Sequence, residues 1–247
     1  NGSPWLALIW FCGTVPVTLF LLRAFPQPYG WMPDGARTEP GQVAEVTGTP
    51  LADAVQSKFF KAVTFGYIFA LGAQVGGALQ LVKLVEERTN RSTATIATIV
   101  LSSMSIISRF AAGRVIPKLN MTRFTVGLAA MQGVSLASIG LINNRLGLLI
   151  AIGLFGITIG NMVMMQSLLL AERFGVRDYP RIAARSGLIS FSGTAFGPLL
   201  LGWLYDVAGG YRSSYLAAGV CSVLGALLFS LAGSASEQDI KSEVITS

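Results

Sequence analysis

The sequence predicts an all-α membrane protein, and three observations support this fold class. Hydrophobic residues make up 52% of the 247 residues and charged residues only 12%, whereas soluble domains carry about 25% charged residues. The mean hydropathy is +0.61. Apolar segments recur near the length of about 20 residues that a bilayer demands, and none alternates with the period of two that is typical of barrel strands. Because such segments satisfy their backbone hydrogen bonds internally only as helices, we expect a transmembrane helical bundle.

Seven segments are predicted to span the membrane, and they divide the chain into four parts. The segments are residues 4–22, 59–84, 94–116, 124–142, 146–170, 186–205 and 213–232. The parts are a first transmembrane helix (1–23), a linker outside the bilayer (24–57), a six-helix domain (58–233) and a polar tail (234–247). The linker holds five of the ten prolines and no apolar run of spanning length. Because the chain begins at Asn1 and almost at once enters an apolar segment, we expect the start of the protein to be missing.

The distribution of lysine and arginine predicts the orientation. If the linker is cytoplasmic, twelve of the 18 lysines and arginines lie on the cytoplasmic side and five on the outer side, with Arg109 set aside. Such an excess marks the cytoplasmic side of a membrane protein. We therefore expect the linker and the tail to be cytoplasmic, and the protein to lie in the plasma membrane, which in a bacterium is the inner membrane.

An arginine inside the third apolar segment is the strongest candidate for a functional residue. Arg109 lies well within residues 94–116, where an arginine costs about 2.5–3.5 kcal/mol on insertion scales. A polar stripe leads to it at helical spacing, made of Thr95, Thr98, Ser102 and Ser105. We expect Arg109 to face a cavity, where a guanidinium can hold a carboxylate through two parallel hydrogen bonds. The alternative is an arginine that extends to the cytoplasmic headgroups.

Other polar residues in the predicted spans extend the candidate substrate-binding site. Tyr67 and Gln74 share one face of the second segment, and Asn161 lies in the fifth. Hydrogen bonds that only hold the helices together are an equally good interpretation of these residues. Small residues favour close helix packing, at Gly72-xxx-Gly76, Gly156-xxx-Gly160 and Gly193-xxx-Gly197. Gly193, Gly197 and Pro198 are further interpreted as a packing surface or hinge in the sixth segment.

Several absences limit the possible functions. The chain has no histidine, and its two cysteines fall in apolar segments, so no metal site or disulfide framework is predicted. Every aspartate and glutamate lies in a loop or at the end of a span. No glycine-rich nucleotide loop and no pairing of a nucleophile with a base is present. We therefore expect neither an enzyme nor a cofactor, and the net charge of +6 does not indicate a nucleic-acid partner.

Two stretches resemble the major facilitator superfamily. The loop at residues 113–123, GRVIPKLNMTR, resembles the G-x-L-x-D-R-x-G-R loop of that superfamily, although Pro117 replaces the aspartate and Asn120 the second glycine. A second pattern looks like its eleventh helix and the following loop, at Gly187, Gly193, Gly197-Pro198, Gly202, Tyr205-Asp206 and Gly209-Gly210-Tyr211. The resemblance implies the six-helix C-terminal bundle of a major facilitator fold, preceded by the last transmembrane helix of a truncated N-terminal half.

Within the superfamily the chain is most similar to monocarboxylate porters and oxalate–formate-type antiporters. The stretches that carry this likeness are residues 50–60, 108–113 (SRFAAG) and 172–175 (ERFG). In the monocarboxylate porters an arginine of the eighth helix contacts the substrate carboxylate, and Arg109 falls at that position. Ser105 stands where those porters often carry an aspartate, and the lysine that some oxalate–formate relatives carry in helix eleven is missing here.

The resemblance implies a secondary active transporter of small organic anions, monocarboxylates or dicarboxylates, that works by alternating access. Its partners would be the organic anion, the lipid bilayer, and a coupled proton or counter-anion. Two alternatives stay open. The transported solute is neutral or cationic and Arg109 only orders helices, or the protein is a membrane receptor or scaffold that does not transport.

Overall fold

The computed structural model describes residues 3–18, 48–116 and 119–235. It divides into two units, residues 1–46 and 47–247, which are described separately. The described residues of the first unit form α1 (Ser3–Pro16). Residues 19–22 of the predicted first span lie outside the described residues, as do most of the predicted linker and tail.

The described part of the second unit is helical and contains no strand. Its helices are α2 (Leu51–Gln56), α3 (Lys58–Arg88), α4 (Arg91–Val115), α5 (Met121–Leu141), α6 (Arg145–Phe174), α7 (Tyr179–Ser190), α8 (Ser192–Ala208) and α9 (Tyr211–Ala232). With α7 and α8 counted together, six helices are long and apolar enough to cross a membrane. An all-α membrane protein is confirmed at this level.

Polar capping residues place several helix starts outside the predicted apolar segments. The side chains of Ser57, Asn90, Asn120 and Asn144 each accept a hydrogen bond from a backbone N–H in the first turn of α3, α4, α5 and α6. Such caps satisfy donors that would otherwise have no partner at a helix start. The helices therefore begin one to three residues before the apolar segments that were used to predict them.

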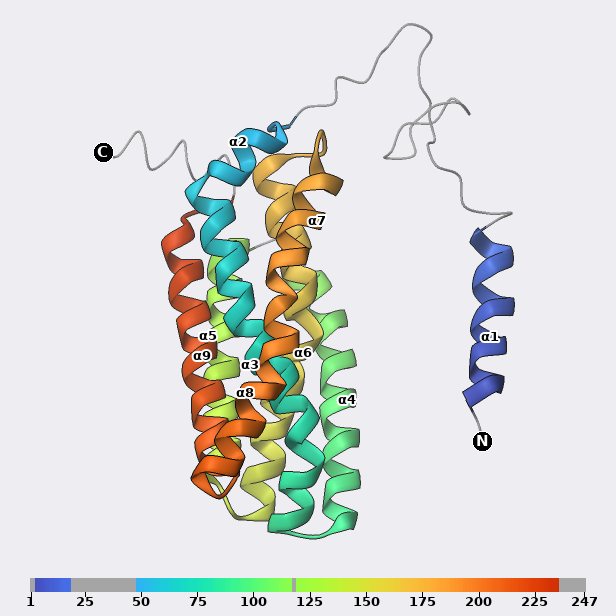
Figure 1. Ribbon diagram of the computed structural model, residues 1–247, viewed down its shortest axis with the longest axis vertical. Helices are drawn as coiled ribbons and strands as arrows, with labels where there is room; N and C mark the ends of the chain where they lie inside the picture. The colour runs from blue at the N-terminus through green and yellow to red at the C-terminus, as the bar shows by residue number, and fades with distance from the viewer. Residues whose placement is uncertain (1–2, 19–47, 117–118, 236–247) are drawn as a thin grey trace, which may run out of the picture. The chain divides into compact units, whose positions relative to one another are not determined.

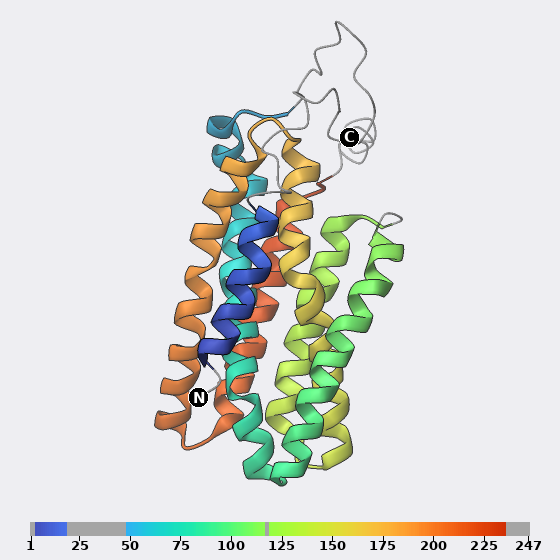
Figure 2. The ribbon, with the colours of Figure 1, turned by 90° about the vertical axis from the view of Figure 1, so that its right-hand side faces the viewer.

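The spanning helices lie side by side with their connections at alternating ends (Figures 1 and 2). Helix α3 packs against α8 and α9, α9 packs against α5, and α6 packs against α4 and α5. One end carries α2, the α4–α5 and α6–α7 connections and the end of α9; we call it the α2 end (Figure 1). The opposite end carries the three other connections. The predicted orientation assigns the lysines and arginines to the two sides of the membrane according to the same grouping of connections.

Glycines set the closest contacts between the helices. A Cβ added at Gly197 would collide with the backbone oxygen of Gly72, and one at Gly193 with that of Ile68, so α3 and α8 cross with their backbones touching. A Cβ at Gly133 of α5 would lie 3.0 Å from the backbone oxygen of Gly219 in α9. Close approach through small residues is the usual means of helix association in membranes.

The predicted sixth span is divided at one residue, Phe191, which keeps helical backbone angles (φ −68°, ψ −13°), and this break in regularity does not fall at its proline. α7 ends at Ser190 and α8 begins at Ser192, whereas Pro198 lies inside α8. The predicted role of Gly193, Gly197 and Pro198 as a hinge stays a prediction. What the structure adds is a break at Phe191, one turn or less from the Gly193 contact with α3.

A buried polar cluster holds the residues next to this break. Gln166 of α6 donates through Nε2 to the hydroxyls of Ser186 (3.1 Å) and Ser190 (2.9 Å). Ser190 in turn donates to the backbone oxygen of Thr64 (3.1 Å) in α3. These bonds join three helices at the end of α7, so side chains from neighbouring helices support the interrupted backbone.

Both ends of the bundle are tied by polar contacts with the backbone. At the α2 end, the carboxylate of Asp178 accepts a hydrogen bond from the backbone N–H of Leu51 (3.0 Å), and Thr49 N–H donates to the oxygen of Phe174 (2.8 Å). At the opposite end, the Arg88 guanidinium donates to three backbone oxygens at the end of α5, those of Ile139, Gly140 and Ile142, at 2.7–3.1 Å. Arg88 therefore joins the end of α3 to the end of α5.

Candidate functional site

Arg109 reaches the middle of the bundle rather than its end. Its Nε donates a hydrogen bond to the backbone oxygen of Gly160 in α6, at 2.8 Å. Gly160 lies 15 residues after the start of α6 at Arg145 and 14 before its end at Phe174. An arginine that extended to the headgroups would point past the end of its helix. The observed contact holds the guanidinium near half the depth of the bundle.

The rest of the Arg109 guanidinium has no partner in the described part of the chain. Its Nη1 and Nη2 atoms make no hydrogen bond or ion pair with a described residue, and the residue is exposed. The stripe on the same face of α4 is open in the same way, since Thr95, Thr98 and Ser102 are also exposed. The described helices therefore leave this polar face of α4 uncovered.

A second set of polar contacts joins α4 to α6 behind Arg109. Asn161 donates through Nδ2 to the Ser108 hydroxyl (3.1 Å) and to the backbone oxygen of Ile157 (2.9 Å). Ser108 donates to the backbone oxygens of Ser105 (3.0 Å) and Ile157 (3.2 Å). Asn161 is 1% exposed, and its Oδ1 is buried without a hydrogen-bond partner.

Ser105 and Asn161 thus lie near Arg109, and glycine makes this possible. A Cβ on Gly160 would collide with the backbone oxygen of Ser105, and one on Gly156 would lie 2.6 Å from that of Leu101. The Ser105 side chain is half-buried, and its hydroxyl forms no hydrogen bond with a described residue. The close approach of α4 to α6 lets the Arg109 side chain reach the Gly160 oxygen directly.

Tyr67 meets α6 from the other side. Its hydroxyl donates to the backbone oxygen of Met162 (3.0 Å), its side chain is fully buried, and its ring lies 4.8 Å from that of Phe229. Met162 is two residues from Gly160, which is about 200° round an α-helix. The structure therefore separates Tyr67 from Arg109 by the width of α6.

Gln74 lies on the same face of α3 as Tyr67 and is 6% exposed. It forms no hydrogen bond with a described residue, and its Oε1 is buried without a partner. A buried amide oxygen without a partner costs free energy unless water or a ligand satisfies it. Gln74 thus carries a buried acceptor that the described residues leave unsatisfied, and no contact joins it to Arg109.

Two residues of the site, Ser108 and Gly160, were not predicted from the sequence to belong to it. Ser108 precedes Arg109 directly, and Gly160 belongs to a glycine pair that was assigned to packing. The partner of Arg109 is a backbone oxygen, which every residue carries, so no residue type in the sequence marks it. The spacing of Gly153, Gly156 and Gly160 on α6 was the available signal for a close neighbour.

The chemistry open to this site is the binding of an anion. The described residues contain no group of three or more histidine, cysteine, aspartate or glutamate side chains that could hold a metal ion. What the site offers is a guanidinium held by Gly160, with Nη groups that have no partner among the described residues, near the Ser105 hydroxyl. These groups donate hydrogen bonds to carboxylate or phosphate oxygens.

Comparison with protein-family models and with curated proteins finds no match to this chain. The resemblance to the major facilitator superfamily therefore stays a prediction from the residues that carry it. The structure supports the coarser description, an all-α protein with six helices capable of spanning a membrane.

Proposed function

We propose that this protein is a secondary active transporter of small organic anions, monocarboxylates or dicarboxylates, in which Arg109 binds the substrate carboxylate. The observation that carries the proposal is the position of the Arg109 guanidinium. It is held at mid-bundle depth by Gly160, two of its nitrogens have no partner among the described residues, and it lies on a polar face that the described helices leave open.

The single contact to Gly160 suits a carboxylate-binding role. A guanidinium offers its N–H groups in a planar fork, and the Gly160 oxygen engages only Nε. The Nη1 and Nη2 groups can donate two parallel hydrogen bonds to the two oxygens of one carboxylate. Because the Nε contact fixes the plane of the guanidinium, less side-chain entropy is lost when the anion binds.

The electrostatics favour an anion over a neutral solute. No described carboxylate forms an ion pair with Arg109, so its positive charge is uncompensated within the described helices. An unpaired charge in a low-dielectric environment is costly, and charged residues within membrane spans usually face a cavity and mark a substrate pathway. A bound carboxylate would supply the missing negative charge.

Alternating access would use the uncovered faces of the bundle. Only 17% of the most apolar stretch of α4 is buried, and the α7–α8 span has the same value. In the major facilitator arrangement that the sequence resembles, such faces meet a second six-helix bundle across the substrate path. We propose that Arg109 and the stripe of Thr95, Thr98 and Ser102 line that path. Coupling to a proton or a counter-anion would use groups outside this stripe, which carries no carboxylate.

One alternative has a specific observation in its favour. The Arg109–Gly160 bond and the Asn161–Ser108 bond both join α4 to α6, so Arg109 could serve only to hold these helices together. In that case the solute would be neutral or cationic. The two functions differ in what happens when the charge of Arg109 is removed.

The test is uptake of labelled lactate, pyruvate, oxalate and formate by cells that express the full-length protein, wild type or Arg109→Gln. Removing one partner of a hydrogen-bonded charge pair costs about 2–5 kcal/mol, so we expect uptake to fall at least about thirtyfold. The matched control is Arg114→Gln, an exposed arginine near the end of the same helix, which should transport normally. If uptake survives in Arg109→Gln at equal membrane abundance, the carboxylate role is wrong and the structural alternative stands.

A further inference from the structure

A groove with two lysines at one end runs along the outside of the bundle between α3 and α9. Its volume is about 650 Å³, and it is lined by Gln56, Lys58, Lys61, Ala62, Phe65, Phe69, Leu228 and Leu231. The polar and basic residues of this lining all come from the α2 end, and the rest is apolar. The groove is therefore positively charged at the α2 end and apolar along the rest of its length.

The two lysines form one basic spot without an acidic neighbour in the lining. Lys58 and Lys61 are three residues apart in the first turn of α3, which places them on the same helix face. Both are exposed, and neither forms an ion pair with a described carboxylate. Their positive charge is therefore available to an anionic group at the membrane surface.

The apolar part of the groove lies on the same face of α3 as the two lysines. Phe65 and Phe69 follow Lys61 at intervals of four residues and are 51% and 38% exposed. Leu228 and Leu231 of α9 form the other wall. The helices approach closely behind the groove because Gly66 and Gly225 face one another, with a Cβ on Gly225 only 2.9 Å from the Gly66 oxygen. The groove is therefore shallow, and its open side faces outward from the bundle.

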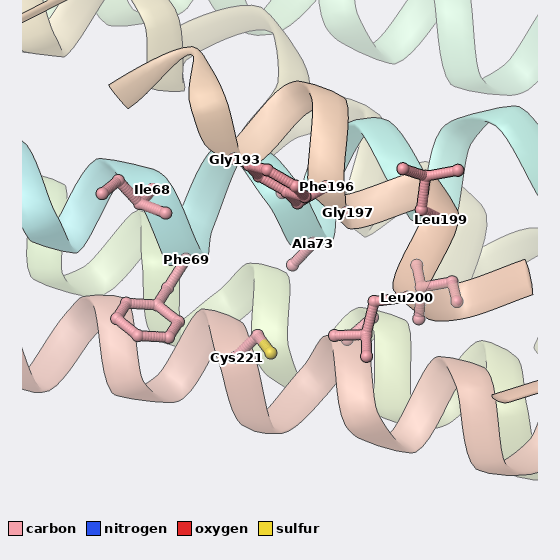
Figure 3. A pocket seen from close by; sticks show the side chains of 12 residues that line it. Ile68, Phe69, Ala73, Gly193, Phe196, Gly197, Leu199, Leu200 and Cys221 are labelled. Atoms are coloured by element: carbon pink, nitrogen blue, oxygen red, sulfur yellow. The ribbon is translucent and has the colours of Figure 1, made fainter. Parts of the chain in front are cut away.

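A second apolar hollow continues from Phe69 toward the middle of the bundle. It has a volume of about 420 Å³ and lies between α3, α8 and α9. Figure 3 shows Phe69, Ala73, Cys221 and Leu200 around it, with the α3–α8 crossing at Gly193 and Gly197 beside it. Phe69 lines both hollows, so they adjoin along α3 and together extend from Lys58 to Ala73.

The combined length of the two hollows matches one leaflet of a bilayer. From Lys58 to Ala73 the rise of α3 is about 22 Å at 1.5 Å per residue. One leaflet, with its headgroup region included, is about 20–22 Å thick, half of the full 40–45 Å. A lipid whose phosphate lies at the lysines would therefore extend its acyl chain along Phe65 and Phe69 into the second hollow.

We propose that this groove binds an anionic glycerophospholipid, with its phosphate at Lys58 and Lys61 and one acyl chain along α3 and α9. Basic pockets between transmembrane helices on the cytoplasmic side recognise anionic headgroups. The α2 end, where the lysines lie, is the end that the excess of positive charge predicts to be cytoplasmic. The site is on a different face of α3 from Tyr67 and Gln74, so it is independent of the proposed carboxylate site.

The experiment uses the full-length protein in nanodiscs that contain photoactivatable phosphatidylglycerol or, in parallel, photoactivatable phosphatidylcholine. After illumination, the labelled residues are mapped by mass spectrometry. We expect phosphatidylglycerol to label Phe65, Phe69, Leu228 or Leu231 in preference to phosphatidylcholine. Each lysine near an anionic surface contributes about a fivefold preference, so the double variant Lys58→Gln/Lys61→Gln should reduce the preference roughly thirtyfold. High salt should reduce it as well.

The matched control is Lys83→Gln/Arg145→Gln, which removes two exposed positive charges from the opposite end and should leave the labelling unchanged. Two results would overturn the proposal. Equal labelling by both lipids, insensitive to Lys58 and Lys61, would mean that only bulk lipid fills the groove. Cross-linking of a photoactivatable residue at position 65 to another protein segment, rather than to lipid, would mean that a helix or a partner covers it.

Discussion

The six spans fall into two groups that differ in how much of each is covered. In α3 and α6, 56% and 61% of the residues in the most apolar stretch are buried, whereas α4 and the α7–α8 span have only 17% each. The closest glycine contacts with a neighbouring backbone join a covered span to an uncovered one, α3 to α8 at Gly193 and Gly197 and α6 to α4 at Gly160. The uncovered spans carry Arg109 and the break at Phe191. Packing thus accounts for the covered spans, whereas the exposed polar face of α4 around Arg109 has no packing reason within the described helices.

Gln132 and Arg109 illustrate the difference between a polar residue that serves packing and one that does not. Gln132 of α5 is fully buried and donates through Nε2 to the Ala70 oxygen (2.9 Å) and the Ser222 hydroxyl (3.0 Å), so it joins α5 to α3 and α9. Arg109 is exposed and makes one contact, although its guanidinium has five N–H groups. A residue that served packing alone would be expected to use more of its donors within the bundle.

The largest effect is expected at the glycine crossing where the covered α3 meets α8 of the uncovered span. Gly197→Ala places a methyl group against the Gly72 backbone oxygen, which cannot move aside as a side chain can. We expect a loss of about 3 kcal/mol or more in stability, or no folded protein at all. Gly202→Ala on the same helix is the control, because its Cβ would meet only the Gln80 side chain at 3.9 Å. Thermal unfolding in detergent measures the stability of both variants. Equal stability of the two would contradict the close backbone contact between α3 and α8.

A smaller loss is expected when the tie between α3 and α5 is removed. Arg88→Gln deletes the donors to three backbone oxygens at the end of α5. Hydrogen bonds from charged groups contribute about 1.5–3 kcal/mol, and Arg88 is half-buried, so we expect a loss of about 2 kcal/mol. Arg91→Gln, an exposed arginine three residues further on, should unfold like wild type. Equal stability of the two variants would contradict the role of Arg88 in joining α3 to the end of α5.

The smallest effect is expected between α4 and α6. A double-mutant cycle on Asn161→Ala and Ser108→Ala measures the energy of the bond between them, which is 3.1 Å long. Such bonds in membrane proteins average about 0.6 kcal/mol. A coupling near this value would leave Arg109 free for another role, because α4 would be held in place without it. A coupling of zero would mean that the two side chains do not interact.

The positions of the six spans could be predicted from the sequence because apolar length alone decides them. The predicted segment 146–170, for example, lies within α6 at Arg145–Phe174. The ends were predicted less well, since caps such as Asn90 and Asn144 are polar and fall outside any apolar window. The break at Phe191 was not predicted, because hydrogen bonds from Gln166 and to Thr64, distant in the chain, support it.

The candidate site could be predicted only in part. Helical spacing placed Arg109 and its stripe on one face of α4, and the structure leaves most of that face exposed. Spacing could not show that Tyr67 and Arg109 meet α6 on different sides, because this depends on which helices are neighbours. Asn161 and Gln166, five residues apart and so about 140° round α6, contact α4 and α7 respectively.

The most direct test of the central claim asks whether the Arg109 face of α4 meets water. Single cysteines at Ser102, Ser105 and Ile107 are introduced into the full-length protein after Cys12 and Cys221 are replaced by alanine. Each is then exposed to a membrane-impermeant thiol reagent. Ile107 is 59% exposed but lies about 160° round the helix from Ser105. We predict fast reaction at 102 and 105, slowed by an excess of the transported anion, and slow reaction at 107. Equal, slow reaction at all three positions would contradict a substrate path along this face.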